Sequence, residues 1–132
     1  MLASLQNLLA ETKHFFNINC LLHCGDSEVQ VDARTGSALY RIAQEAIHNA
    51  IKHGNARQID VELAVDAGQL CLRIRDDGIG FQTQTPDQTG MGLRVMGYRA
   101  RSIGAKLHIS SQPNQGTEIR CEVPFPAANR SR

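Results

Sequence analysis

The clearest pattern in this chain is a helical spacing of its apolar residues. It is most regular between residues 36 and 53, where one helix face collects Leu39, Ala43, Ala46, Ile47 and Ala50. Gly54-Asn55 follows at once, which is typical of a helix C-terminus. Shorter patterns of the same kind predict helices over residues 2–15 and 93–103. The chain is therefore predicted to contain three helices.

Between these helices apolar and polar residues alternate, as they do in strands that bury one face. The alternation and the turn residues between the runs predict six strands, over residues 19–24, 28–32, 59–65, 70–74, 107–111 and 117–123. Short turn segments at 66–69 and 113–116 predict that the last four of these strands form two hairpins. The simplest packing is an α+β fold: a two-layer sandwich of one mixed, mostly antiparallel sheet with helices on one face.

Length and composition describe one globular domain. The chain has 132 residues, of which 42% are hydrophobic and 20% charged, and these values exclude a disordered chain. A net charge of +1 predicts no nucleic-acid partner and no membrane contact. Since the sequence shows neither a membrane span nor a signal peptide, we expect a cytoplasmic domain over residues 1–126. The segment 78–92 is predicted to be a flexible loop, and 127–132 a disordered tail.

The cysteines show no spacing that is typical of a metal site or of a disulfide framework. Cys20, His23 and Cys24 lie close together, but no second pair of ligands follows at the separation that zinc sites use. All four cysteines, including Cys71 and Cys121, lie in apolar runs. We therefore expect buried free thiols, as in proteins of a reducing compartment.

One side of the predicted central helix carries a strip of polar side chains. At 100° per residue, Glu45, Asn49 and Lys52 fall within an arc of about 60° beside the apolar stripe, with His53 close to its edge. An amide oxygen suits a hard cation, an ammonium and an imidazole can contact phosphate, and a carboxylate can accept a proton. Taken alone, the strip is more typical of a solvated helix face than of a binding site.

Two glycine-containing segments follow this helix. Asp76 stands at a strand end, where its carboxylate could accept a hydrogen bond from an exocyclic amine such as that of adenine. Gly78 and Gly80 come next and permit a sharp turn against a flat ligand. The segment 90–93 opens a helix whose free N–H groups suit phosphate. Either segment alone is typical of a turn or a helix start, and both together in this order indicate a nucleotide site.

Four motifs in this order resemble the ATP-binding catalytic domain of bacterial sensor histidine kinases, within the GHKL or Bergerat-fold superfamily. They are YRIAQEAIHNAIKHG from Tyr40, DDGIGF from Asp76, GMGLRVM from Gly90 and QGTEIRCEVPF from Gln115. The helix motif Q-E-A-x-x-N-A-x-K-H is most similar to the subgroup of nitrate and sugar-phosphate sensors. The resemblance covers nearly the whole chain, and it implies nucleotide held between the helices and a lid.

The resemblance implies a role for each polar residue of the central helix. Asn49 would coordinate the Mg²⁺ ion that bridges the phosphates of ATP. Glu45, one turn earlier, would act as the base or orient the attacking group. Lys52 and His53 would face the phosphates. ATP and Mg²⁺ are therefore the cofactors that the sequence predicts.

The resemblance also implies how the base would be held. Asp76 would bind the adenine amine, Gly78 and Gly80 would shape the pocket, and Ile79 would pack nearby. Thr117 would place a hydroxyl near the base. The lid over the phosphates would be formed by Gly90, Met91, Gly92 and Leu93.

The implied activity is transfer of the γ-phosphoryl group of ATP to a histidine on a separate dimerisation domain, and from there to a response regulator. No histidine of this chain is followed by an acidic residue, so we expect the acceptor elsewhere and a monomer with little activity of its own. Two alternatives stay open. One is a free-standing protein serine kinase of the anti-sigma-factor type, and the other is a non-catalytic nucleotide-binding scaffold.

Overall fold

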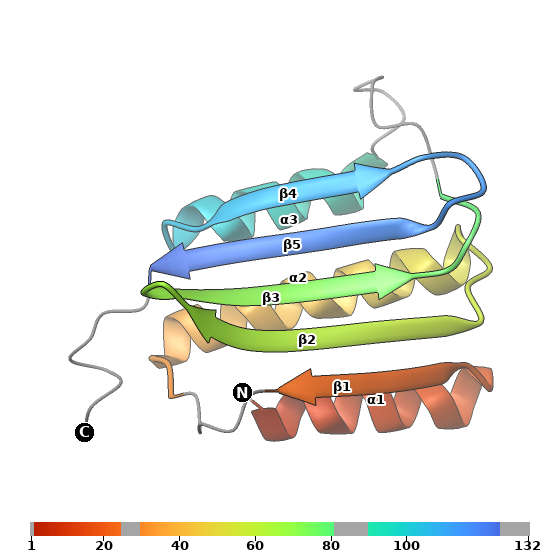
Figure 1. Ribbon diagram of the computed structural model, residues 1–132, viewed down its shortest axis with the longest axis horizontal. Helices are drawn as coiled ribbons and strands as arrows, with labels where there is room; N and C mark the ends of the chain where they lie inside the picture. Colours follow the sequence, from red (N-terminus) through yellow and green to blue (C-terminus); the bar gives the residue numbers. More distant parts are fainter. Residues whose placement is uncertain (1, 25–29, 81–89, 125–132) are drawn as a thin grey trace.

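The computed structural model describes residues 2–24, 30–80 and 90–124, which form two layers (Figure 1). The elements follow in the order α1 (Leu2–Phe16), β1 (Asn19–Cys24), α2 (Ala33–Lys52), β2 (Gln58–Asp66), β3 (Gln69–Asp76), α3 (Gly90–Ser102), β4 (Lys106–Ser111) and β5 (Thr117–Pro124). Figure 1 shows the three helices on one face of a single sheet. The predicted α+β sandwich is confirmed.

The sheet has five strands in the order β1-β2-β3-β5-β4. Strand β1 pairs with β2 in parallel, and every other pair is antiparallel. At the tip of the first hairpin, Ala67 and Gly68 have φ values of 52° and 77°, as the tight turns that suit twisted hairpins require. Both predicted hairpins are confirmed, and so is the mixed, mostly antiparallel character of the sheet.

The core lies between the sheet and the helices because both layers present apolar faces to each other. On the sheet it collects alternate residues of the central strands, among them Ile59, Val61, Leu63, Leu70, Leu72, Ile74, Ile119, Cys121 and Val123. On α2 it collects Leu39, Ile42, Ala43, Ala46, Ile47 and Ala50. Each fully buried Leu or Ile contributes about 1.5–3 kcal/mol to folding. Residues on the flank of α2 are thus held in fixed positions beside a packed stripe.

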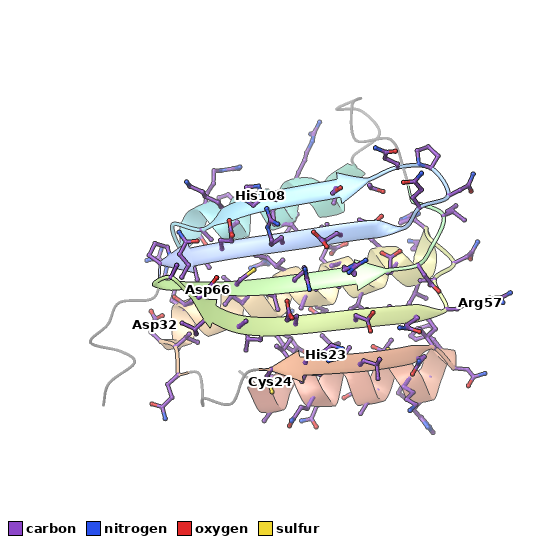
Figure 2. All side chains as sticks on the ribbon, viewed as in Figure 1. His23, Cys24, Asp32, Arg57, Asp66 and His108 are labelled. Carbon is purple, nitrogen blue, oxygen red and sulfur yellow. The ribbon has the colours of Figure 1, made fainter. Side chains whose placement is uncertain are left out.

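The other face of the sheet is polar and carries ion pairs between neighbouring strands. Arg73 lies 2.9 Å from Glu62, and His108 lies 3.1 Å from Glu122. Figure 2 shows side chains standing on this face with no helix over them, His23 and His108 among them. Exposed pairs of this kind contribute at most about 1 kcal/mol each. The chemistry therefore concentrates on the helix side of the sheet.

The structure corrects the predicted elements at three places. The predicted strand over 28–32 is wrong for its described residues, because residues 30–32 form no strand and Asp32 is the N-cap of α2. Helix α2 begins at Ala33 rather than Gly36, and α3 begins at Gly90 rather than Leu93. Helix α2 thus includes Gly36 in its first turn, where the good helix formers Ala33 and Arg34 offset the cost of one glycine.

All four cysteines are free thiols, but their burial differs from the prediction at one position. Cys121 is buried, and burial raises the pKa of its thiol to about 12. Cys20 and Cys71 are half-buried. Cys24 is exposed, because it is the last residue of the edge strand β1. The prediction of a buried thiol is therefore wrong for Cys24.

Some predictions concern segments beyond the described residues. The part of the predicted loop over 81–89 and the predicted tail after residue 126 both lie there. The domain boundary at 126 stays a prediction. Among the described helices, none combines the length and the apolar character needed to cross a membrane.

Candidate active site

The polar strip predicted on the central helix exists and borders the core. Glu45 and Asn49 lie one turn apart on α2 and are half-buried, because their neighbours Ala46 and Ala50 pack into the core. The Glu45 carboxylate lies 3.8 Å from Nδ1 of His48 on its exposed side. Lys52 ends α2 and its C-cap residue His53 follows, both of them exposed. The structure thus groups Glu45 with Asn49 and leaves Lys52 and His53 at the helix end.

The start of α3 rests directly on this strip. A Cβ atom added to Gly92 would lie 2.5 Å from Oε2 of Glu45 and 3.4 Å from Nδ2 of Asn49. A side chain at this position would displace the Glu45 carboxylate, so glycine lets α3 approach the strip while the carboxylate keeps its place. Leu93 and Met96 are buried and fix α3 on the core. The free N–H groups of a helix N-terminus therefore stand beside a carboxylate and an amide.

Asp76 lies at the end of β3 on the helix-covered face, in line with the buried Leu72 and Ile74. Its Oδ1 accepts a hydrogen bond of 2.8 Å from the backbone N–H of Gly78. Burial raises the pKa of Asp76 and outweighs the hydrogen bonds from the backbone of Gly78 and Thr117. The side chain is a half-buried acceptor, as the recognition of an amine requires.

The turn after Asp76 is locked to the end of α2. The backbone N–H of Ile79 donates to the carbonyl oxygen of Gly54 over 2.8 Å. A Cβ atom on Gly78 would lie 2.9 Å from the Gly54 carbonyl carbon, and Gly80 has a φ of 69°. Both glycines are therefore required by the backbone path, which confirms the predicted sharp turn.

Asp77 anchors the same turn, a role that the sequence analysis missed. Its Oδ1 accepts hydrogen bonds from the backbone N–H groups of Arg57 at 2.8 Å and Gln58 at 3.0 Å. These bonds lower the pKa of Asp77, that from Gln58 most. The two adjacent aspartates thus have different roles. Asp77 anchors the backbone of the turn, and Asp76 lies on the helix-covered face of the sheet. The alternation along β3 distinguishes them, because Asp76 continues the series of Leu72 and Ile74 and Asp77 lies beyond the strand end.

Thr117 is placed beside Asp76 by the sheet register. Thr117 opens β5 directly opposite Asp76 on β3, and Ser111 ends β4 directly opposite Thr117. The Ser111 and Thr117 hydroxyl oxygens lie 2.8 Å apart, and Ser111 is only 7% exposed. The sequence analysis missed Ser111, although its place in line with Leu107 and Ile109 already indicated the same sheet face.

A shallow depression of about 240 Å³ adjoins this turn on its outer side. It is lined by Gly54, Asn55, Arg57, Asp77, Gly78, Ile79 and Asn114. Neither the polar strip of α2 nor Thr117 contributes to it, so it borders the candidate site and does not contain it. Ile79 is 48% exposed, as a residue at such a border can be.

All these groups gather at one end of the sheet. Figure 1 shows β3 and β4 ending, and β5 beginning, at the end where α2 also ends. The arrangement offers a helix N-terminus for phosphate, an amide oxygen for a hard cation and a buried carboxylate for an amine. These are the groups that a nucleoside triphosphate needs.

Residues 35–127 match the family described as "Histidine kinase-, DNA gyrase B-, and HSP90-like ATPase". The chain belongs to this family. The match runs from the first turn of α2 past the end of β5, so it includes every group described above. The family prediction is confirmed, and with it an ATP-binding domain. The placement among nitrate and sugar-phosphate sensors stays a prediction, as do the roles of single residues.

Similar proteins agree with the family. Among curated relatives, "Sensor protein VraS" of Staphylococcus epidermidis and of Staphylococcus aureus are each 43% identical over 87 residues, which cover 66% of this chain and 25% of the relative. The chain thus spans about a quarter of the length of these relatives.

Two solved structures share the fold. The histidine kinase domain of a blue-light activated kinase from Erythrobacter litoralis has a TM-score of 0.74 and 22% identity, covering 92% of this chain and 59% of that one. The histidine kinase AdeS of Acinetobacter baumannii has a TM-score of 0.76 and 20% identity, covering 93% and 64%.

Proposed function

We propose that this chain is the catalytic domain of a sensor histidine kinase, which transfers the γ-phosphoryl group of ATP to a histidine on a separate dimerisation domain. The observation that carries the proposal is the contact of Gly92 with Glu45 and Asn49. It brings together a helix N-terminus, a carboxylate and an amide of the kind that can ligate a metal ion. Phosphoryl transfer requires mainly such positioning and charge neutralisation, and little covalent chemistry.

The phosphate end of the nucleotide would lie between α2 and the start of α3. Asn49 offers the amide oxygen that suits Mg²⁺, and the phosphates would complete its ligands. When bound, Mg²⁺ neutralises charge on the β- and γ-phosphates. The N–H groups of the segment 90–93 would close over the same oxygens. Lys52 and His53 stand at the end of α2, from which their long side chains can reach phosphate.

The carboxylates take different parts in this scheme. Glu45 lies beside the helix N-terminus, where it would accept the proton of the attacking imidazole or orient that ring. Asp76 would accept hydrogen bonds from the adenine amine, with Thr117 beside it. Gly78 and Gly80 hold the turn that lines this end, and Ile79 would pack near the base. The phosphoryl group then passes from the histidine to an aspartate of a response regulator.

The test is phosphoryl transfer in trans. The purified chain is mixed with an isolated phospho-accepting hairpin of a sensor kinase and labelled Mg-ATP. We expect label on histidine, which is lost in acid and kept in alkali. Label on serine, or on another protein only, would favour the anti-sigma-factor type of kinase and contradict the proposal. Nucleotide binding without any transfer would indicate the non-catalytic scaffold.

A variant identifies the residue that handles the metal. Asn49→Asp should abolish the transfer, because the added charge alters both the metal and the phosphate environment. Its melting temperature should change little, since Asn49 borders the core without filling it. A variant that transfers phosphate like the unaltered chain would remove Asn49 from the mechanism. The matched control is Asn55→Asp, at an exposed position beyond the helix.

A further inference from the structure

We propose that Ser111 fixes the direction of the Thr117 hydroxyl and thereby makes the site select adenine over purines that carry a 6-oxo group. The inference rests on the proposed function, because it assumes that the base lies against Asp76. It assigns a specificity-determining role to a residue that does not itself need to contact the nucleotide.

One row of the sheet carries three polar side chains. Asp76 on β3, Thr117 on β5 and Ser111 on β4 stand directly opposite one another and point to the helix-covered face. The next row toward the core is entirely apolar, with Ile74, Ile119 and Ile109. Opposite residues of neighbouring strands lie about 5 Å apart. The three polar side chains therefore form a short polar edge at the end of the apolar, helix-covered face of the sheet.

The hydrogen bonds along this edge have a fixed direction. The Ser111 hydroxyl donates to the carbonyl oxygen of Gly116 over 3.1 Å, and a carbonyl can only accept. A serine hydroxyl has one hydrogen, so it cannot also donate across the 2.8 Å to Thr117. With the Ser111 hydrogen directed at Gly116, we infer that the Thr117 hydroxyl is the donor in the pair with Ser111. Since Ser111 is only 7% exposed, water does not easily replace either bond.

This direction leaves Thr117 as an acceptor toward the site. Its only hydroxyl hydrogen is used on Ser111, so toward the site the Thr117 oxygen offers lone pairs and no hydrogen. Asp76, when ionised, is also an acceptor only. Two neighbouring acceptors match an exocyclic amine, which has two hydrogens to donate, directly or through one water. A 6-oxo group presents a third acceptor, so its carbonyl oxygen meets two acceptors and finds no donor among them, which is unfavourable.

The variant Ser111→Ala tests whether the direction of the Thr117 hydroxyl determines which purine base is preferred. Affinities for non-hydrolysable analogues of ATP and ITP are measured by calorimetry with Mg²⁺ at pH 8. We expect the unaltered chain to prefer the ATP analogue by about tenfold or more. In the variant the freed Thr117 hydrogen can turn toward the base and meet a 6-oxo group, so this preference should fall several-fold. Ser111→Thr keeps the hydroxyl and should keep the preference.

The ratio of the two affinities separates specificity from damage to the fold. A purely structural defect would weaken both nucleotides alike and leave their ratio unchanged, and that result would overturn the inference. If Ser111→Ala does not fold, Thr117→Val serves instead: it removes the second acceptor, so a lowered ratio is expected and an unaltered ratio overturns the inference. An unaltered chain that binds both nucleotides equally overturns the inference alone. Binding of neither contradicts the proposed function as well.

Discussion

Single residues of this site contribute to function and at the same time lower the stability of the folded state. Asp76 is a half-buried carboxylate next to a second acid, and burial raises its pKa. A raised carboxyl pKa means that the folded state binds protons more strongly than the unfolded state does. Folding is then weakened as the pH rises through the interval above the ordinary value of 3.8. The ionised form of Asp76 is therefore a destabilising group in the folded protein.

Asp76→Asn should accordingly raise the melting temperature at pH 7 while it weakens nucleotide binding. The amide oxygen of asparagine can still accept the hydrogen bond from Gly78, so only the charge is removed. Thermal unfolding with and without nucleotide measures both effects on one sample. A lower melting temperature of the free variant would show that the ionised carboxylate stabilises the fold, contrary to our assignment.

Asp77 should behave in the opposite way. Hydrogen bonds from the backbone of Gln58 and Arg57 lower its pKa, so its contribution to stability is present above the ordinary value of 3.8 and is lost as the pH falls through the lowered value. Asp77→Ala should therefore unfold at a lower temperature than the unaltered chain at pH 7. We expect the difference to shrink below pH 3.8. Equal unfolding temperatures at pH 7 would contradict the anchoring role.

At the scale of elements, the site depends on how closely α3 approaches α2. Gly92→Ala would push the Glu45 carboxylate aside, since its Cβ atom would lie 2.5 Å from Oε2. We expect phosphoryl transfer to fall by about tenfold or more, with a smaller loss of nucleotide affinity. Transfer to an isolated acceptor hairpin measures the first, and calorimetry the second.

Gly97 in the same helix provides the matched control. A Cβ atom there would meet only the end of the flexible Arg101 side chain, at 3.3 Å. Gly97→Ala should leave transfer unchanged and stabilise the fold by about 0.5–1 kcal/mol, as alanine does inside helices. If both variants lose phosphoryl transfer equally, transfer depends on helix α3 as a whole. The loss in Gly92→Ala is then not caused by the specific contact with Glu45.

Elements whose signal is local were predictable from the sequence. The apolar stripe of α2 and the alternation of the two hairpins depend on neighbours a few residues apart, and both are confirmed. The flank position of Glu45 and Asn49 follows from the same helical period. The start of α2 was placed too late, because the N-cap Asp32 lies in a polar segment without periodicity.

The non-local parts of the site were not predictable in the same way. Ser111 gains its role from strand register, and Asp77 from hydrogen bonds to β2. The contact of Gly92 with Glu45 depends on how two helices pack. Composition and spacing along the chain contain no information on such distances, so these features required the structure.

At the scale of the whole molecule, the two faces of the sheet have different roles. The outer face carries paired charges, and the inner face carries the core and, at its end, the polar row of Asp76, Thr117 and Ser111. The site lies where α2, α3 and three strand ends meet (Figure 1). A ligand that fills it would connect both layers and should raise the unfolding temperature of the entire domain.

The most direct test of the account is calorimetric titration of the purified chain with a non-hydrolysable ATP analogue, with and without Mg²⁺. We predict binding that is stronger with Mg²⁺ and that Asp76→Asn weakens by about 1–3 kcal/mol. Asp66→Asn, at an exposed hairpin residue (Figure 2), should bind like the unaltered chain. Absence of binding, or equal binding by both variants, would contradict the proposed site.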